Sequence, residues 1–357
     1  MKCTSTIEDV ASYGNLLLAY ANAKRGRSKY RAVQRVELNK LCCLRTIQTQ
    51  LLSGTYRTSE YTHKIIRERG KERLISKLPF YPDRIVHWAY IQKINPVFLA
   101  KFSNRSYASL PGKGIHGALY HVRFLLLHYP EDTTYCLKVD MKKYFQNISH
   151  DILKLQLRED VESLSFLVCL DELIDSFSSS RGSGIPLGNY TSQPFANRFL
   201  TSLDRWLEQK GVFHVRYMDD LVIFGKSSSD CHALRVELSE RLFRYFQLSL
   251  KENWQVFPVK QRGIDFLGYR IYPNRVLMRK ARYNRLRRVL LRVKKSVLET
   301  GRMTSRNRSV VASYAGWIRF CTPKAKQTIW SKYFEPVLRL SGESKFCEKL
   351  YKMVFEK

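Results

Sequence analysis

The feature that most constrains this chain is a pair of adjacent aspartates, Asp219 and Asp220, inside the apolar stretch "VRYMDDLVIFG" at 215–225. Aspartate is poor in strands, and burying its carboxylate without a partner is costly. The flanking residues are typical of strands, so the stretch predicts a strand–turn–strand with the aspartates at the turn. Taken alone, the pair also fits an exposed polar turn. Two adjacent carboxylates repel each other, however, unless a cation lies between them.

A third carboxylate, Asp140, ends an apolar strand predicted at 134–141. The elements predicted from there to about residue 272 follow the order β-α-β-β-α-β, the split βαβ pattern of a ferredoxin-like sheet. This order places Asp140 on a strand next to the aspartate pair. Oxygen ligands without a thiol or imidazole pattern select Mg²⁺, with Mn²⁺ as the alternative. Three carboxylates at one sheet edge can hold two such ions about 4 Å apart for phosphoryl chemistry.

The charge of the chain points to a polyanionic partner. Its 357 residues include 62 Lys or Arg and 31 Asp or Glu, a net charge of +31. The segment 279–357 holds 21 basic and 5 acidic residues, so 21 − 5 = +16 of this surplus lies there, in a helical pattern. Neutralising phosphates releases counterions, which makes nucleic acid the favoured partner. A merely soluble basic protein is the less favoured alternative.

Other sequence features limit the class of protein. The eight cysteines form no C-x-x-C pair, so we expect reduced thiols and no zinc site. The N-terminus lacks the layout of a signal peptide, and no run of about 18 apolar residues predicts a membrane span. We therefore expect a cytoplasmic protein without membrane contact.

The remaining pattern predicts mostly helices around the strands. Residues 1–55 read as helical, with Leu38, Leu41, Leu44, Ile47 and Leu51 on one helix face. Strands at 61–67 and 73–78 flank a charged turn. The next helix is expected to be capped by Asp83 and to end near Pro96. Further predicted helices are 150–176, 191–209 and 230–247, with a loop at 178–189.

These motifs resemble those of reverse transcriptases and occur in that family's order over about residues 60–275. "YMDD" resembles motif C, and "LKVDMKKYFQNI" at 137–148 resembles motif A. Three further stretches resemble the fingers, motif B and the primer grip, in that order: "RERGKERLISKLPFYPDRIVHWAY" at 67–90, "GIPLGNYTSQPFAN" at 184–197 and "GIDFLGYRI" at 263–271. The resemblance implies an α+β right-hand polymerase fold with fingers, a palm built on the split βαβ sheet and a helical thumb.

The same resemblance implies a domain layout and a reaction. An N-terminal helical extension would span 1–58, fingers and palm 59–275, and a basic helical thumb 276–357. The implied function is RNA-directed DNA polymerisation by two-metal-ion nucleotidyl transfer. The implied cofactor is a pair of Mg²⁺ ions, and the implied substrates are dNTPs, template RNA and the growing cDNA.

One departure in motif B points to a subtype. Most reverse transcriptases read QGxxxSP here, whereas this chain reads LGxxxSQ, with Leu187, Gly188, Ser192 and Gln193. This variant resembles the enzymes of diversity-generating retroelements of bacteria and phages, which implies misincorporation opposite template adenine. The residue chemistry alone predicts only lower fidelity, because Leu cannot form the hydrogen bonds that Gln forms.

Site residues carry over from the resemblance motif by motif. Asp140, Asp219 and Asp220 would be catalytic and would ligate the metal ions, with help from the backbone carbonyl of Met141. Arg73 and Lys77 would grip the triphosphate, with Lys71 and Arg84 as nearby candidates. Phe145 would exclude a 2′-hydroxyl, although plain core packing is the alternative reading. The expected motif B contacts are Leu187, Gly188 and Gln193, although Gln193 equally fits a residue that only begins the next helix. The expected primer grip is Phe266, Leu267, Gly268 and Tyr269.

Several alternatives stay open at this point. The chain also fits another bacterial reverse transcriptase of group II-like, retron-like or phage-defence type, or a non-catalytic RNA-binding assembly protein. The retroelement resemblance implies a structured template RNA and a pentameric, small, basic accessory variability protein as partners. Lys251 lies where a general acid is expected, but "SLKENWQVF" departs from the usual motif, so no general acid is assigned.

Overall fold

A computed structural model describes residues 2–68 and 71–356. The chain forms two compact units. The first comprises Met1–Pro111, Lys138–Leu221 and Ala233–Trp254, and the second Gly112–Leu137, Val222–His232 and Gln255–Lys357. The tip of the predicted fingers hairpin, Arg69 and Gly70, lies outside the described residues, as does the side chain of Lys71. The predicted extension, fingers–palm and thumb boundaries stay a prediction.

The N-terminal part of the first unit is helical, as predicted. Its helices are α1 (Ile7–Ala11), α2 (Tyr13–Lys24), α3 (Arg31–Leu38), α4 (Lys40–Leu52) and α5 (Ile85–Lys101). Helix α2 packs along α5, and α4 packs against α1. The predicted face of α4 is buried at Leu44, Ile47 and Leu51. The pattern was wrong at its start, because the helix is interrupted at Asn39 and Leu38 and Leu41 are exposed.

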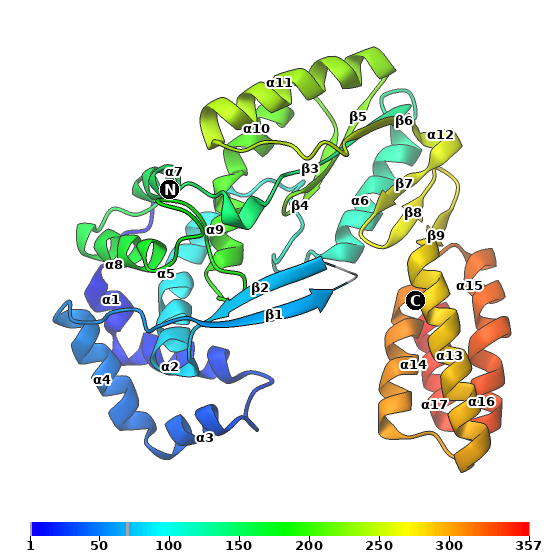
Figure 1. The fold of residues 1–357 in the computed structure, drawn as a ribbon, viewed down its shortest axis with the longest axis horizontal. Helices are drawn as coiled ribbons and strands as arrows, with labels where there is room; N and C mark the ends of the chain where they lie inside the picture. The colour runs from blue at the N-terminus through cyan, green and yellow to red at the C-terminus, as the bar shows by residue number, and fades with distance from the viewer. Residues whose placement is uncertain (1, 69–70, 357) are drawn as a thin grey trace. The chain divides into compact units, whose positions relative to one another are not determined.

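The fingers hairpin is an antiparallel pair of strands, β1 (Thr62–Glu68) and β2 (Lys71–Lys77) (Figure 1). Its register pairs Thr62 with Lys77 and Ile66 with Arg73. Two predictions beyond the hairpin were wrong. Asp83 does not cap α5; it is buried and accepts hydrogen bonds from the Tyr56 hydroxyl at 2.9 Å and the Ser59 amide at 3.0 Å. Helix α5 also continues through Pro96, because Val97 and Phe98 remain buried in the core.

The central sheet has four strands in the order β4-β5-β3-β6 (Figure 1). These strands are β3 (Tyr135–Asp140), β4 (His214–Tyr217), β5 (Asp220–Gly225) and β6 (Gln255–Pro258). Of these four strands, β3 comes first along the chain, and it lies between the third, β5, and the fourth, β6. This is the arrangement expected of a split βαβ, ferredoxin-like sheet. This confirms the predicted α+β palm and makes β3 and β5, which carry Asp140 and Asp220, neighbours.

Helices connect these strands. They are α7 (His150–Arg158), α8 (Leu164–Asp175), α9 (Ser192–Phe199), α10 (Thr201–Gln209) and α11 (Ser228–Phe246). The single helix predicted at 191–209 is two helices, because the backbone turns at Leu200, where ψ is 6°. The break lets α9 and α10 present different side chains to the core.

The second unit combines a small sheet with helices. The sheet is the antiparallel meander β7 (Ile264–Phe266), β8 (Tyr269–Ile271) and β9 (Val276–Met278). Its helices are α6 (Ile115–His128), α12 (Val259–Arg262), α13 (Lys280–Thr300), α14 (Ser305–Ile318), α15 (Pro323–Ile329), α16 (Glu335–Ser341) and α17 (Ser344–Phe355). Helix α13 buries Leu286, Leu290, Val293 and Val297.

Two predictions of absence can be compared with the described residues. All eight cysteines are free thiols in the structure. No helix between residues 2 and 356, outside the two-residue gap, combines the length and the apolar character that crossing a membrane requires.

Candidate active site

The turn between β4 and β5 presents the aspartate pair. Tyr217 ends β4, Asp220 begins β5, and Met218 and Asp219 make the turn. Met218 has φ of 59°, a left-handed conformation that costs a non-glycine residue about 1–2 kcal/mol. Its side chain is nonetheless buried. The surrounding residues therefore have to hold this turn in place.

Arg216 provides that support from the preceding strand. Its side chain is fully buried, and its Nη1 donates a hydrogen bond to the Met218 carbonyl at 3.1 Å. The other edge of the guanidinium binds Asp204 of α10 in a bidentate pair, with Nε–Oδ1 at 2.8 Å and Nη2–Oδ2 at 2.6 Å. Burial by itself raises the pKa of a carboxyl group, but the Arg216 charge outweighs it and holds the pKa of Asp204 below its ordinary value.

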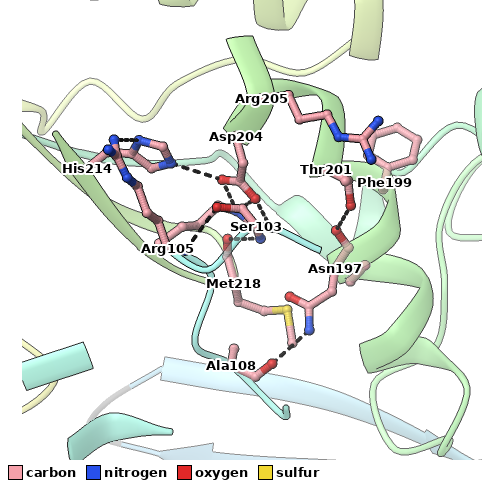
Figure 2. Close-up of polar contacts among 12 residues, drawn as sticks. Ser103, Arg105, Ala108, Asn197, Phe199, Thr201, Asp204, Arg205, His214 and Met218 are labelled. Carbon is pink, nitrogen blue, oxygen red and sulfur yellow. Dashed lines mark hydrogen bonds and ion pairs between the residues drawn. The ribbon is translucent and has the colours of Figure 1, made fainter. Parts of the chain in front are cut away.

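Figure 2 shows polar contacts around Asp204 and its neighbours. His214 Nε2 lies 3.5 Å from Asp204 Oδ1. The backbone of Arg216 bonds to residues 105 and 107 on the adjoining segment, with N–O distances of 2.9 and 3.0 Å. Asn197 of α9 donates to the Ala108 carbonyl at 2.7 Å, so the same segment is also tied to motif B. The aspartate turn is thus anchored to α9, α10 and residues 105–108.

Asp140 and Asp219 are the two carboxylates that the structure brings together. Met141 N donates to the Asp219 carbonyl at 3.3 Å, which joins the end of β3 to the turn. Burial and the neighbouring charge of Asp140 raise the pKa of Asp219 to about 6. Lys251 supplies the nearest cation, with Nζ 2.6 Å from Asp140 Oδ1, and its amide donates to the Asp140 carbonyl at 2.8 Å.

Asp220 takes a different environment. Its Oδ1 lies 3.8 Å from Lys138 Nζ, on the neighbouring strand β3. Among the described residues, no three carboxylate, imidazole or thiol groups gather closely enough to hold a metal ion. Of the three predicted carboxylates, Asp140 and Asp219 are therefore adjacent, whereas Asp220 is paired with Lys138. Half-buried, oxygen-only and mutually repelling, Asp140 and Asp219 fit a hard divalent cation.

Four of the six residues predicted to bind the nucleotide line one cavity of about 240 Å³. They are Phe145, Leu187, Gly188 and Gln193. The adjacent Tyr144 is buried, and its hydroxyl donates to the Ala196 carbonyl at 2.5 Å. Of the two neighbouring aromatic rings, Tyr144 therefore packs in the core and Phe145 faces the cavity.

The motif B loop is fixed by its contact with the fingers hairpin. Ser76 N on β2 donates to the Leu187 carbonyl at 3.0 Å. Gly188 has φ of +131°, and a Cβ there would lie 2.8 Å from the Ser76 carbonyl oxygen. Only glycine fits both this conformation and this close approach. Arg73 and Lys77 are exposed on β2 and do not belong to the cavity lining.

The predicted primer grip belongs to the second unit and is described by itself. Phe266 and Tyr269 are fully buried, and the Tyr269 hydroxyl donates to the Trp317 carbonyl at 3.0 Å. Leu267 and Gly268 form the hairpin turn, with φ of 50° and 93°. Any contact with a primer would therefore involve this turn, while the two rings hold it in place. The grip stays a prediction.

Sequence reasoning missed Asp204 and Arg216 and left Lys251 unassigned. A signal for Arg216 was present, because an arginine in the apolar strand "FHVRYMDD" requires a buried partner. Nothing in the local pattern identifies Asp204 as that partner. Its helix is amphipathic, and an aspartate there reads as an exposed residue.

Comparison with known proteins places these residues in a family. The sequence profile described as "Reverse transcriptase (RNA-dependent DNA polymerase)" matches residues 62–271. Protein YkfC of Escherichia coli K12 is 23% identical over 286 residues, covering 68% of this chain and 74% of that protein. The putative COX1/OXI3 intron 1 protein of Saccharomyces cerevisiae is 25% identical over 133 residues, covering 35% and 16%.

The fold has solved relatives as well. Telomerase from Candida albicans, in complex with a fragment of telomeric RNA, superposes with a TM-score of 0.53 at 13% identity, over 83% of this chain and 55% of that one. The chain thus spans about half the length of that telomerase, and the likeness concerns the fold alone. The family profile, by contrast, covers more than half of this chain, including the turn with Asp219 and the strand with Asp140. The chain belongs to the reverse transcriptase family of RNA-dependent DNA polymerases.

Proposed function

We propose that this protein copies RNA into DNA, with Asp140 and Asp219 as the catalytic carboxylates. The observation that carries the proposal is the adjacency of these two groups at the end of β3 and the β4–β5 turn. Asp220, which begins β5, is proposed to complete the ligand set on substrate binding, together with the backbone carbonyl of Met141. Mg²⁺ is the proposed ion, with Mn²⁺ as a substitute, because the donors are all oxygens.

The residues of this chain would position the metal ions and the substrates and would neutralise charge. When bound, the ions would activate the primer 3′-hydroxyl and neutralise the developing charge on the pyrophosphate. Asp140 and Asp219 would hold them, and Lys251 would balance the charge of Asp140 when they are absent. Phe145 would block the 2′-hydroxyl of a ribonucleotide, and Arg73 and Lys77 on β2 would bind the triphosphate.

The subtype we propose is the error-prone enzyme of a diversity-generating retroelement. Its support is Leu187, which lines the nucleotide cavity beside Phe145 and offers shape and dispersion without hydrogen bonds. Looser positioning lowers the transition-state difference between right and wrong pairs. A more accurate bacterial reverse transcriptase of group II-like, retron-like or phage-defence type is the second candidate, and the similarity to the putative COX1/OXI3 intron 1 protein favours its group II-like form.

Sequencing of cDNA made on a defined RNA template separates the two candidates. For wild type we expect errors concentrated opposite template adenine. Leu187→Gln, which restores a hydrogen-bonding side chain, should lower that error rate several-fold. The control Leu187→Met keeps an apolar side chain of similar volume and should leave it unchanged. An adenine error rate that Leu187→Gln does not alter would contradict the proposed role of Leu187.

The partners we propose are a structured template RNA, the cDNA and the dNTPs, together with the small, basic, pentameric accessory protein of such retroelements. The enzyme is itself strongly basic at +31, so RNA would have to bridge two basic proteins. Acidic stretches such as "REDVESL" at 158–164 offer a direct alternative. Loss of the complex on RNase treatment would favour bridging, and an RNase-resistant complex would favour direct contact.

A further inference from the structure

The cavity beside Phe145 and Leu187 contains two guanidinium groups that the proposed mechanism does not use. Arg27 reaches it from the turn between α2 and α3, and Arg84 reaches it from the residue before α5. The rest of the lining is neutral, with no Asp or Glu among the described lining residues. Two positive charges therefore share a small cavity without a counter-charge in its wall.

Arg84 is the more constrained of the two. Its Nε is buried and donates no hydrogen bond to any described residue. Burial and then the nearby charge of Arg27 lower the pKa of Arg84. A half-buried guanidinium with an unsatisfied N–H and a like charge next to it is unfavourable in isolation. An anion bound between the two guanidinium groups would remove the repulsion of the like charges.

The wall that holds Arg84 is well ordered by packing. Trp88, one helical turn further along α5, stacks on Tyr190 with ring centroids 3.8 Å apart and planes at 16°. Tyr190 also lines the cavity, together with the amides of Asn189 and Gln193. Gln193 is held in turn by Ser109, whose Oγ donates to Oε1 at 2.5 Å. The cavity therefore offers two charged forks, together with neutral hydrogen-bonding groups held by packing and by Ser109.

We infer that Arg27 and Arg84 together form a phosphate-binding site, made of residues other than Arg73 and Lys77. Arg84 was one of the nearby triphosphate candidates in the sequence, whereas Arg27 was not. Guanidinium groups suit this ligand because their planar forks match phosphate oxygens. The phosphate comes either from the backbone of the RNA template or from the incoming nucleotide. The choice of these two sources rests on the proposed function, whereas the anion site itself rests on the cavity.

Binding without chemistry tests the site first. The probe is a fluorescently labelled RNA template annealed to a DNA primer, titrated with the full chain at several salt concentrations without nucleotides. Arg27→Gln and Arg84→Gln are compared with Arg25→Gln, an exposed arginine of the same turn outside the cavity lining. If the site binds a template phosphate, each cavity variant should reduce the steepness of the plot of log K against log salt by about one relative to that control.

The second arm measures the KM for dNTPs in primer extension with the same variants. A KM raised several-fold with an unchanged salt slope assigns the site to the nucleotide triphosphate. If both arms match Arg25→Gln, the phosphate site is overturned. Arg84→Lys keeps the charge but loses the fork, and it should fall between wild type and Arg84→Gln. Arg27 is exposed, so Arg27→Gln keeps the test valid even where melting curves show that Arg84→Gln unfolds.

This design separates the inference from the proposed function. If the protein binds the probe but extends no primer, polymerisation fails while the salt slopes still decide the template arm. In that case equilibrium binding of a labelled dNTP replaces the KM measurement. The site then stands or falls on binding alone.

Discussion

Asp219 lies beside Asp140 in a half-buried position, so its negative charge opposes folding when no cation is bound. Its pKa is raised from 3.8 to about 6 by burial and by Asp140. The unfolded chain loses this proton at a lower pH than the folded one, so stability falls as the pH rises from about 4 to 6. Above about pH 6 Asp219 is charged in the folded chain, and the full loss of folding stability remains.

We therefore expect Asp219→Asn to stabilise the metal-free protein at pH 7 by about 1–2 kcal/mol, discounted for partial exposure. The gain should vanish near pH 4, where the folded wild type is already protonated. Asp220→Asn is the matched control, because Asp220 has Lys138 nearby, and it should give no gain. Thermal melting in chelator at both pH values measures this. An unchanged or lowered melting temperature for Asp219→Asn at pH 7 would contradict the account.

The buried pair Asp204–Arg216 holds the carbonyl of Met218 and with it the turn that carries Asp219, the proposed catalytic residue. Asp204→Asn leaves the Arg216 charge buried without its partner and should destabilise the protein by about 3–5 kcal/mol. Replacing both residues, Asp204→Leu with Arg216→Met, should recover most of that stability because no buried charge remains.

The double variant should still polymerise poorly, since nothing then donates to the Met218 carbonyl. Urea denaturation gives the stability, and kcat with KM for dNTP gives the function. We expect a lower kcat with little change in KM, because the turn carries the proposed catalytic carboxylate rather than the proposed substrate contacts. A double variant with wild-type kcat would show that the pair is only structural.

Among the structural elements, two glycines should respond in opposite ways to replacement by alanine. Gly316 lies inside α14, and a Cβ added there would meet no atom of the described residues within 4 Å, so Gly316→Ala should stabilise by about 0.5–1 kcal/mol. Gly188→Ala should instead push β2 away from the motif B loop and reduce polymerase activity. Melting temperature and steady-state kinetics of both variants check this, and equal effects would argue against the close approach seen at Gly188.

The sequence predicted element types well and element ends less well. The alternation of apolar residues around "YMDD" and "KVDM" was enough to order the palm strands, because local chemistry decides strand and turn there. Pro96 and Asp83 were misread because long-range contacts outweigh local rules. Burial of Phe98 keeps α5 intact beyond the proline, and Tyr56 and Ser59 take up the Asp83 carboxylate. Such contacts join residues far apart in sequence and leave no local pattern.

The residues of the candidate site were likewise only partly predictable from the sequence. The carboxylates and the motif B residues followed from motifs, whereas Asp204, Arg27 and the position of Lys251 did not. These residues act through partners on other elements, and a single sequence does not reveal which distant residue fills a cavity or neutralises a buried charge. The pairing of Asp220 with Lys138 likewise joins residues of two neighbouring strands, β5 and β3, that are far apart in the sequence.

At the scale of the whole molecule, the surplus of +31 predicts binding dominated by phosphate contacts. Affinity for a template–primer should fall by about a thousandfold or more between about 50 and 200 mM salt if six or more phosphates are contacted. The melting temperature should change far less over that range. Fluorescence anisotropy and thermal melting in the same buffers measure both, and a salt-independent affinity would contradict nucleic-acid binding through this charge.

The most direct test of the central claim is primer extension on an RNA template with Mg²⁺, comparing dNTPs with rNTPs and wild type with Asp219→Asn. We predict a DNA product from wild type with dNTPs and little product with rNTPs, because Phe145 would exclude the 2′-hydroxyl. Asp219→Asn should give no product, although that variant should melt at a higher temperature. Equal extension by Asp219→Asn, or a preference for rNTPs, would contradict the assignment of these residues as the centre of an RNA-directed DNA polymerase.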